Sequence, residues 1–132
     1  NRRSQEKTHM QRFIIILAVL AVLSVSTVPA KRAAPAKVPP VTVGKIEYRV
    51  PTSQMGCVEA WDTGSDEMIW RRQIYVVKYI VGLERDVQDV FIMALGLKDR
   101  TLVVSNERKS EYEMDLDTLQ VKVVKGVLVE TK

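Results

Sequence analysis

Residues 56–70 read GCVEAWDTGSDEMIW, and they predict the element on which the rest of the fold is built, a β-hairpin. Successive side chains of a strand point to opposite sides. One side of the first predicted strand carries Val58, Ala60 and Asp62, and the other carries Cys57, Glu59 and Trp61. Positions 62–66 supply turn-forming side chains, and Gly64 tolerates positive φ. An apolar run restarts at 68–70, so we expect the chain to fold back there.

The order of residue types in this hairpin resembles the outer hairpin of the quinoprotein-type (PQQ-like) β-propeller repeat. A glycine, an apolar residue, an alanine, an Asp-Thr-Gly turn and an apolar pair ending in Trp70 follow one another as in that family. Trp61 replaces a small or aliphatic residue of the family pattern, and the pair at 66–67 lengthens the turn. Residues 112–121 match more weakly, with Leu119 in place of glycine. The resemblance implies one to two blade-like units and no bound cofactor, because quinone binding in that family requires a whole ring of blades.

The rest of the chain predicts a mainly β domain, an antiparallel meander of about seven short strands. The other segments that alternate in polarity or are rich in β-branched residues are 45–50, 74–81, 101–105, 112–117 and 119–123. Residues 71–73 would interrupt the sheet at a bulge or at a crossing between two sheet segments. A closed propeller needs at least about four blades, so a domain of this length would form a smaller body or protect its edges by self-association.

Residues 83–97 allow two interpretations. Leu83, Val87 and Phe91 belong to a set of apolar residues at helical spacing, which predicts a short amphipathic helix. The run 90–97 is apolar on every side and leads into the next strand. That pattern favours a polar loop followed by a doubly buried strand that begins at Val90.

The first 30 residues carry a targeting pattern. Residues 1–9 precede the first methionine and read as upstream sequence. Residues 10–30 combine Arg12, the apolar run 13–23 and a small-residue stretch ending at Ala30, as a secretory signal peptide does. The apolar run is shorter than the roughly 20 residues of a membrane-spanning helix. We therefore expect export to the periplasm or the exterior with cleavage, and an uncleaved N-terminal anchor is the alternative.

Residues 31–40 hold three prolines and three cations, which predicts an extended tether that can neither pack nor pair continuously. The β domain would then comprise residues 41–132. These carry 13 basic and 15 acidic side chains, so the net charge of +4 comes from the leader and the tether. Without a basic surface in the folded part, nucleic acid is not an expected partner. A membrane is expected only through the signal segment.

The residue inventory excludes several kinds of site. The single histidine, His9, precedes the leader, so the domain has no imidazole for a catalytic triad, a metal site or a neutral acid–base role. Cys57 is the only cysteine, and we expect a buried, unpaired thiol on a strand. The carboxylates within 84–89 and 111–117 could bind Ca²⁺, but they are typical of solvated surface. We predict no catalytic residue, no metal and no cofactor.

These observations favour an exported, non-enzymatic β domain that acts through protein contact or self-association. The alternative is a small-ligand or saccharide-binding module in which Trp61, Trp70 and Tyr75 supply aromatic contacts. Packing between sheet layers is the other interpretation of the two tryptophans. A truncated quinoprotein-like dehydrogenase is the third hypothesis.

Overall fold

A computed structural model of the chain describes residues 32–33 and 35–126. The predicted upstream segment 1–9 and signal segment 10–30 lie outside the described residues, so cleavage and export remain predictions. In the described part of the chain, no helix has both the length and the apolar character needed to span a bilayer.

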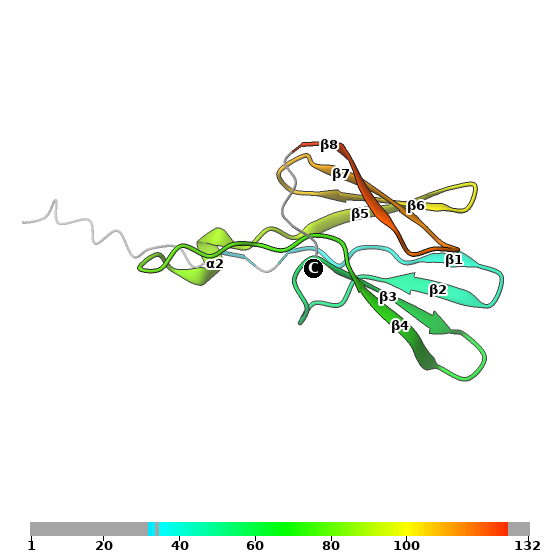
Figure 1. The fold of residues 1–132 in the computed structure, drawn as a ribbon. Helices are drawn as coiled ribbons and strands as arrows, with labels where there is room; N and C mark the ends of the chain where they lie inside the picture. Colours follow the sequence, from blue (N-terminus) through cyan, green and yellow to red (C-terminus); the bar gives the residue numbers. More distant parts are fainter. Residues whose placement is uncertain (1–31, 34, 127–132) are drawn as a thin grey trace, which may run out of the picture. The chain divides into compact units, whose positions relative to one another are not determined.

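The first sheet contains four antiparallel strands in sequential order (Figure 1). They are β1 (Val41–Val43), β2 (Ile46–Arg49), β3 (Cys57–Asp62) and β4 (Glu67–Gln73). Strands β3 and β4 form the predicted hairpin, which pairs from Cys57 opposite Gln73 to Asp62 opposite Glu67. The alternating strand predicted at 45–50 is confirmed by β2, whereas β1 was not predicted as a strand.

The second sheet repeats this arrangement. Its strands, again antiparallel and sequential, are β5 (Ile92–Lys98), β6 (Thr101–Asn106), β7 (Glu111–Asp115) and β8 (Val121–Lys125). The one helix of the described residues is α2 (Arg85–Gln88), which lies between the sheets in the sequence. The mainly β, antiparallel prediction is therefore confirmed, with eight strands and a short helix within 83–97.

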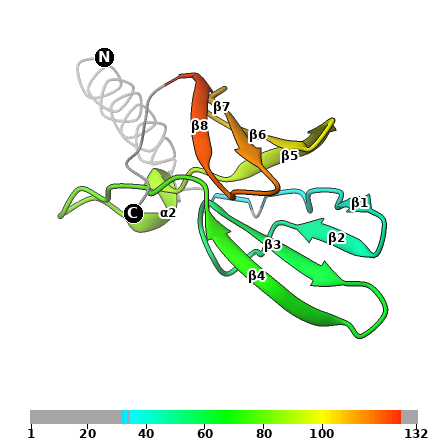
Figure 2. The ribbon, with the colours of Figure 1, turned by 45° about the vertical axis from the view of Figure 1, so that its right-hand side comes forward.

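One hydrophobic core joins the two sheets. Its completely buried side chains are Val58, Ala60, Ile74, Tyr75, Leu102, Val104 and Met114. The rings of Tyr75 and Tyr112 stack with their centroids 5.3 Å apart, so the chain after β4 contacts β7. Strands β1 and β5 also contact each other, and both lie along the middle of the fold in Figures 1 and 2. Each sheet therefore turns one face toward this core.

The β3–β4 and β7–β8 hairpins turn in the same way. In each, an aspartate Oδ1 atom accepts hydrogen bonds from the backbone N–H groups two and three residues later, at 2.8–2.9 Å. The two residues are Asp62 and Asp115. These hydrogen bonds, first of all those from Ser65 and Thr118, lower the pKa of both carboxyl groups because they stabilise the ionised form.

The left-handed residue of each turn is the fourth after the aspartate. Asp66 has φ 54° and Leu119 has φ 57°. Gly64 tolerates positive φ but does not adopt it here, because it is not among the positive-φ glycines. The fixed geometry of the aspartate cap decides which position is left-handed, and it does so without a glycine.

Two strand predictions around β4 are wrong. Residues 71–73 continue β4 instead of interrupting it, and the irregularity lies earlier, where Ile69 is an extra residue between two paired positions. Residues 74–81 form no strand. Ile74 N donates to Gly56 O at 2.8 Å, and Tyr75 turns into the core. Among the placed strands, none pairs with the β-branched residues that follow, so tertiary packing overrides their intrinsic preference.

The strand predicted from Val90 begins at Ile92 and is not buried on both faces. Ala94 and Lys98 are exposed on β5, on the face opposite to the one that carries the buried Leu102. A doubly buried strand needs a covering layer on each side, and the outer face of the second sheet has none among the described residues.

The segment predicted as a tether contacts the folded domain at two places. Val38 is buried in the core. The guanidinium of Arg32 donates to Asp86 O at 3.1 Å and to Asp89 O at 2.8 Å. Proline and charge content predicts how a segment behaves alone, but it does not reveal single anchoring contacts of this kind.

Candidate functional site

The two tryptophans lie on opposite faces of the first sheet. Trp70 is opposite Ala60 on the core face, and its ring centroid lies 5.8 Å from that of Tyr48. Trp61, the neighbour of Ala60 along β3, points to the outer face, where the Arg49 guanidinium lies 4.9 Å from its ring centroid. The structure therefore does not bring Trp61 and Trp70 together as one aromatic platform.

Tyr75 is a core residue. Its ring is completely buried, and its hydroxyl donates a hydrogen bond of 2.5 Å to Val90 O. Burial raises the pKa of the hydroxyl, because the phenolate would lose its solvation. Of the three aromatic residues predicted to contact a ligand, only Trp61 lies on the face that points away from the core.

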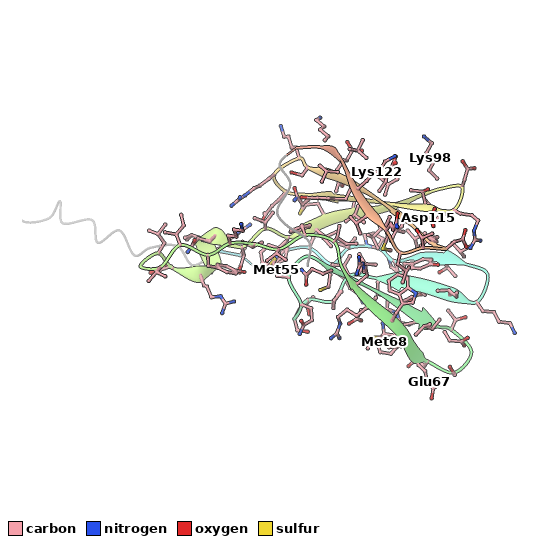
Figure 3. All side chains as sticks on the ribbon, in the orientation of Figure 1. Met55, Glu67, Met68, Lys98, Asp115 and Lys122 are labelled. Atoms are coloured by element: carbon pink, nitrogen blue, oxygen red, sulfur yellow. The ribbon has the colours of Figure 1, made fainter. Side chains whose placement is uncertain are left out.

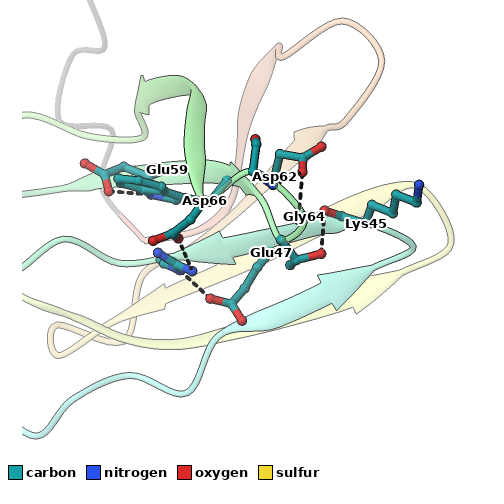
Figure 4. A network of polar contacts seen from close by, with 10 residues as sticks. Lys45, Glu47, Glu59, Asp62, Gly64 and Asp66 are labelled. Atoms are coloured by element: carbon teal, nitrogen blue, oxygen red, sulfur yellow. Dashed lines mark hydrogen bonds and ion pairs between the residues drawn. The ribbon is translucent and has the colours of Figure 1, made fainter.

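The outer face of the first sheet carries a polar network that includes Glu59, Glu47 and Asp66 (Figure 4). Glu59 Oε1 accepts hydrogen bonds from Arg71 Nε at 2.8 Å and Arg71 Nη2 at 2.6 Å, while Glu59 Oε2 accepts one from Trp61 Nε1 at 2.9 Å. Arg49 forms ion pairs with Glu47 and Asp66 on the same face. The Glu59 carboxylate is thus buried and paired, so this network orders the face and presents no free acid.

Cys57 stands at the end of this face, opposite Gln73. The thiol is buried and its Sγ atom donates to Gln73 Oε1 at 3.1 Å. Burial is the main cause that raises the thiol pKa, so the reactive thiolate is disfavoured.

We therefore expect the native protein to resist bulky thiol reagents. The rate of modification of the Cys57 thiol, monitored by absorbance, should be at least ~100-fold lower in buffer than in guanidinium chloride. In the native protein the reaction requires local opening of the structure. Equal rates in the two solvents would contradict this assignment. An exposed cysteine introduced by Ser65→Cys provides the matched control, since it should react at once.

A groove with a volume of about 500 Å³ opens beside α2, and we call it the loop groove. Its main lining side chains are Arg32, Met55, Tyr79, Arg85, Asp89 and Phe91. Met55 lies toward the α2 end of the sheets in Figure 3. Three separate segments of the chain thus meet at one end of the sheets, an arrangement that loops of β proteins commonly use for binding.

Aromatic rings and arginines pair within the loop groove. The Arg85 guanidinium lies 4.5 Å from the centroid of the Tyr79 ring, and that of Arg32 lies 5.0 Å from the centroid of Phe91. The Tyr79 hydroxyl donates to Asp89 Oδ1 at 2.7 Å. Burial, followed by this hydrogen bond, raises the pKa of Tyr79.

Sequence reasoning identified the acidic residues of 84–89 but not this groove, because Arg32 and Met55 come from distant segments. In the described residues, no three His, Cys, Asp or Glu side chains gather as metal ligands would. Asp89 instead accepts the Tyr79 hydroxyl, and Asp86 Oδ1 accepts the backbone N–H of Val87 at 3.0 Å.

Exposed apolar side chains gather in two kinds of place among the described residues. Five of the nine large ones lie on edge strands: Met68 and Ile69 on β4, Met93 and Leu97 on β5, and Val124 on β8. The other four are Ile80, Val81, Leu83 and Val87. We call the segment 80–87 the apolar loop. Because these side chains cluster instead of being scattered, both places are candidate contact surfaces.

Comparison with known proteins leaves the chain without an assigned family. No protein-family model matches it, and no curated protein sequence is similar enough to count as a relative.

Proposed function

We propose that this chain is an exported, non-enzymatic β domain that works by protein contact, through self-association at the free edge of β4. The leader pattern of residues 10–30 supports export, with an uncleaved N-terminal anchor as the alternative. The observation that carries the proposal is the clustering of exposed apolar side chains on edge strands.

Strand β4 is the edge with the clearest capacity for contact. It is seven residues long and, among the described residues, it pairs only with β3. Met68 is 43% exposed and Ile69 is 51% exposed. Met68 lies beside Glu67 at the start of the strand (Figure 3). An edge with unpaired backbone groups and apolar side chains favours pairing with another chain.

A second copy is the occupant that we favour for this edge. Two β4 strands related by a two-fold axis would form an isologous contact. The bulge at Ile69 breaks the regular ladder. Backbone pairing would therefore use residues 70–73, while Met68 and Ile69 would pack against their symmetry mates.

The resemblance to the PQQ-like propeller repeat is part of the same proposal. Each sheet has four sequential antiparallel strands, as a propeller blade does, and the two hairpin turns have the same aspartate-capped geometry. Two blades are fewer than the roughly four that closure requires. Two blade-like sheets would therefore leave edges that another subunit can cover.

The variant Ile69→Lys tests the proposal. We expect the parent protein to be a dimer at micromolar concentration in sedimentation equilibrium. Lysine on an edge strand opposes pairing, so the variant should dissociate at least ~10-fold more readily. Ser65→Lys adds the same charge in the adjacent exposed turn and should leave the dimer intact.

A parent protein that remains monomeric at high concentration and yields no cross-linked dimer would overturn the proposal. If Ile69→Lys and Ser65→Lys weaken the dimer equally, net charge controls the association. That result would also count against the β4 edge as the contact surface. Circular dichroism of each variant shows that the sheets persist.

The loop groove supports a second candidate function, a small-ligand or saccharide-binding module. Its volume and its two aromatic rings suit a compact ligand with an apolar face. Trp61 and Trp70, on opposite faces of a sheet, cannot both serve one ligand there. Titration with a panel of glycans and quinones, followed by heteronuclear NMR, should change the chemical shifts of groove residues. These changes should be absent in the Tyr79→Ala variant. A panel that shifts none of them would remove this candidate.

A further inference from the structure

We propose that the apolar loop, residues 80–87, inserts its side chains into the surface layer of a lipid bilayer. Within these eight positions Val81 is 100% exposed, Ile80 65%, Val87 61% and Leu83 57%. No other segment of the described residues exposes four large apolar side chains so close together in sequence. The proposal concerns a surface distinct from the β4 edge and does not depend on self-association.

The apolar loop is held in shape from within. The Gln88 side chain accepts the Ile80 N–H at 2.6 Å through Oε1. Its Nε2 group donates to the carbonyl oxygens of Ile80, Leu83 and Glu84, each at 3.2 Å. These bonds satisfy backbone groups that would be costly to bury in an apolar medium. They also reduce the conformational entropy that docking would cost.

The base of the apolar loop has the composition of a membrane–water interface. Tyr79 and Phe91 lie there, each with an arginine over its ring. Aromatic rings and arginine stems commonly reside at the headgroup level, with the charge in water. Such a base would leave only the four apolar side chains to enter the acyl region.

The charges near the loop nearly cancel. The basic residues are Arg32, Lys78 and Arg85, and the acidic residues are Glu84, Asp86, Asp89 and Glu107, whose carboxylate pairs with Arg32. A base with so little net charge does not require anionic lipid, so a zwitterionic bilayer should suffice. Binding should then depend weakly on salt, because little net charge is available to screen.

The course of the chain favours lipid over a protein partner. Arg32 is bonded to the loop base through the carbonyl oxygens of Asp86 and Asp89. The apolar run 13–23 ends nine positions before Arg32. Nine residues span at most about 30 Å. If the N-terminal segment is not cleaved, the apolar run 13–23 would insert in lipid as an anchor. The short connection would then keep the apolar loop close to the same bilayer.

A fluorescence experiment on the full chain tests the proposal. Val81→Cys, made in a Cys57→Ser background, carries an environment-sensitive label and is mixed with phosphatidylcholine vesicles. We expect a blue shift, a several-fold rise in emission and quenching by lipids brominated near the headgroup. The same label at Ser65→Cys, in the β3–β4 turn at the other end of β4, should stay in water.

A second variant separates the loop from the leader. In this variant the label is placed at Val87→Cys and Leu83→Asp is introduced into the apolar loop. The label should then report a ratio of inserted to free loop that is lower by about 10-fold or more. This loss is expected even if the whole chain still sediments with vesicles. A label at position 81 that stays in water while the chain sediments would mean that the leader alone binds lipid, and the proposal would fail. A blue shift that appears without vesicles and grows with protein concentration would instead assign the loop to a protein contact.

Discussion

Replacing Gly56 by alanine is expected to destabilise the domain by more than about 3 kcal/mol, enough to leave much of it unfolded. Gly56 has φ 70°, and an added Cβ atom would lie 2.3 Å from the backbone oxygen of Tyr75. That oxygen belongs to the segment that turns Tyr75 into the core, so it cannot move without disturbing the buried ring. Urea denaturation followed by tryptophan fluorescence measures the loss.

Gly44→Ala provides the matched control for this prediction. Gly44 has φ 61°, but a Cβ atom there would meet nothing within 4 Å. The control therefore carries only the conformational cost of a left-handed alanine, about 1 kcal/mol. If both variants lose the same stability, the close approach of Gly56 to Tyr75 does not constrain the fold and the prediction is wrong.

Leu102→Ala should cost the domain 2–5 kcal/mol, by the range measured for large-to-small substitutions in cores. Leu102, on β6, is completely buried and faces the first sheet through the common core. The substitution removes apolar atoms from the contact that holds the two sheets together, and a rigid surround would leave a cavity. Thermal denaturation followed by circular dichroism should show a fall in Tm of at least about 8 °C for a domain of this size.

Leu97→Ala is the control, since Leu97 pairs directly with Leu102 across β5 and β6. Leu97 is 41% exposed, so much of its side chain is already in water. We expect the control to cost less than half of the free energy lost in Leu102→Ala. Equal costs would mean that the two sheets do not share the core described above.

The β-hairpin of residues 56–70 could be predicted because local information is sufficient there. An alternating strand and an aspartate-rich turn define a hairpin without reference to the rest of the chain. Similar alternation of Tyr112 and Met114 predicted β7 and its buried face correctly. Residues 74–81 show the limit of such reasoning, since a β-branched run forms a strand only where a partner strand is available.

The candidate surfaces were less accessible to sequence reasoning. Trp61 and Trp70 suggested one aromatic site, but the alternation of β3 and the pairing of β4 place them on opposite faces. The loop groove requires Arg32, Met55 and Tyr79 to meet, although they are 23 or more positions apart in sequence. No periodicity reports such long-range proximity.

By itself, the sequence of this protein determined a mainly antiparallel β domain, the hairpin of residues 56–70 and a folded part without histidine. These properties follow from residue type and from spacing along a strand, which are local. Only the tertiary structure decided that two four-stranded sheets share one core, that no other described strand pairs with the outer edge of β4 and that the apolar loop projects four side chains. Those outcomes depend on which surfaces meet, and burial is a property of the whole packed chain.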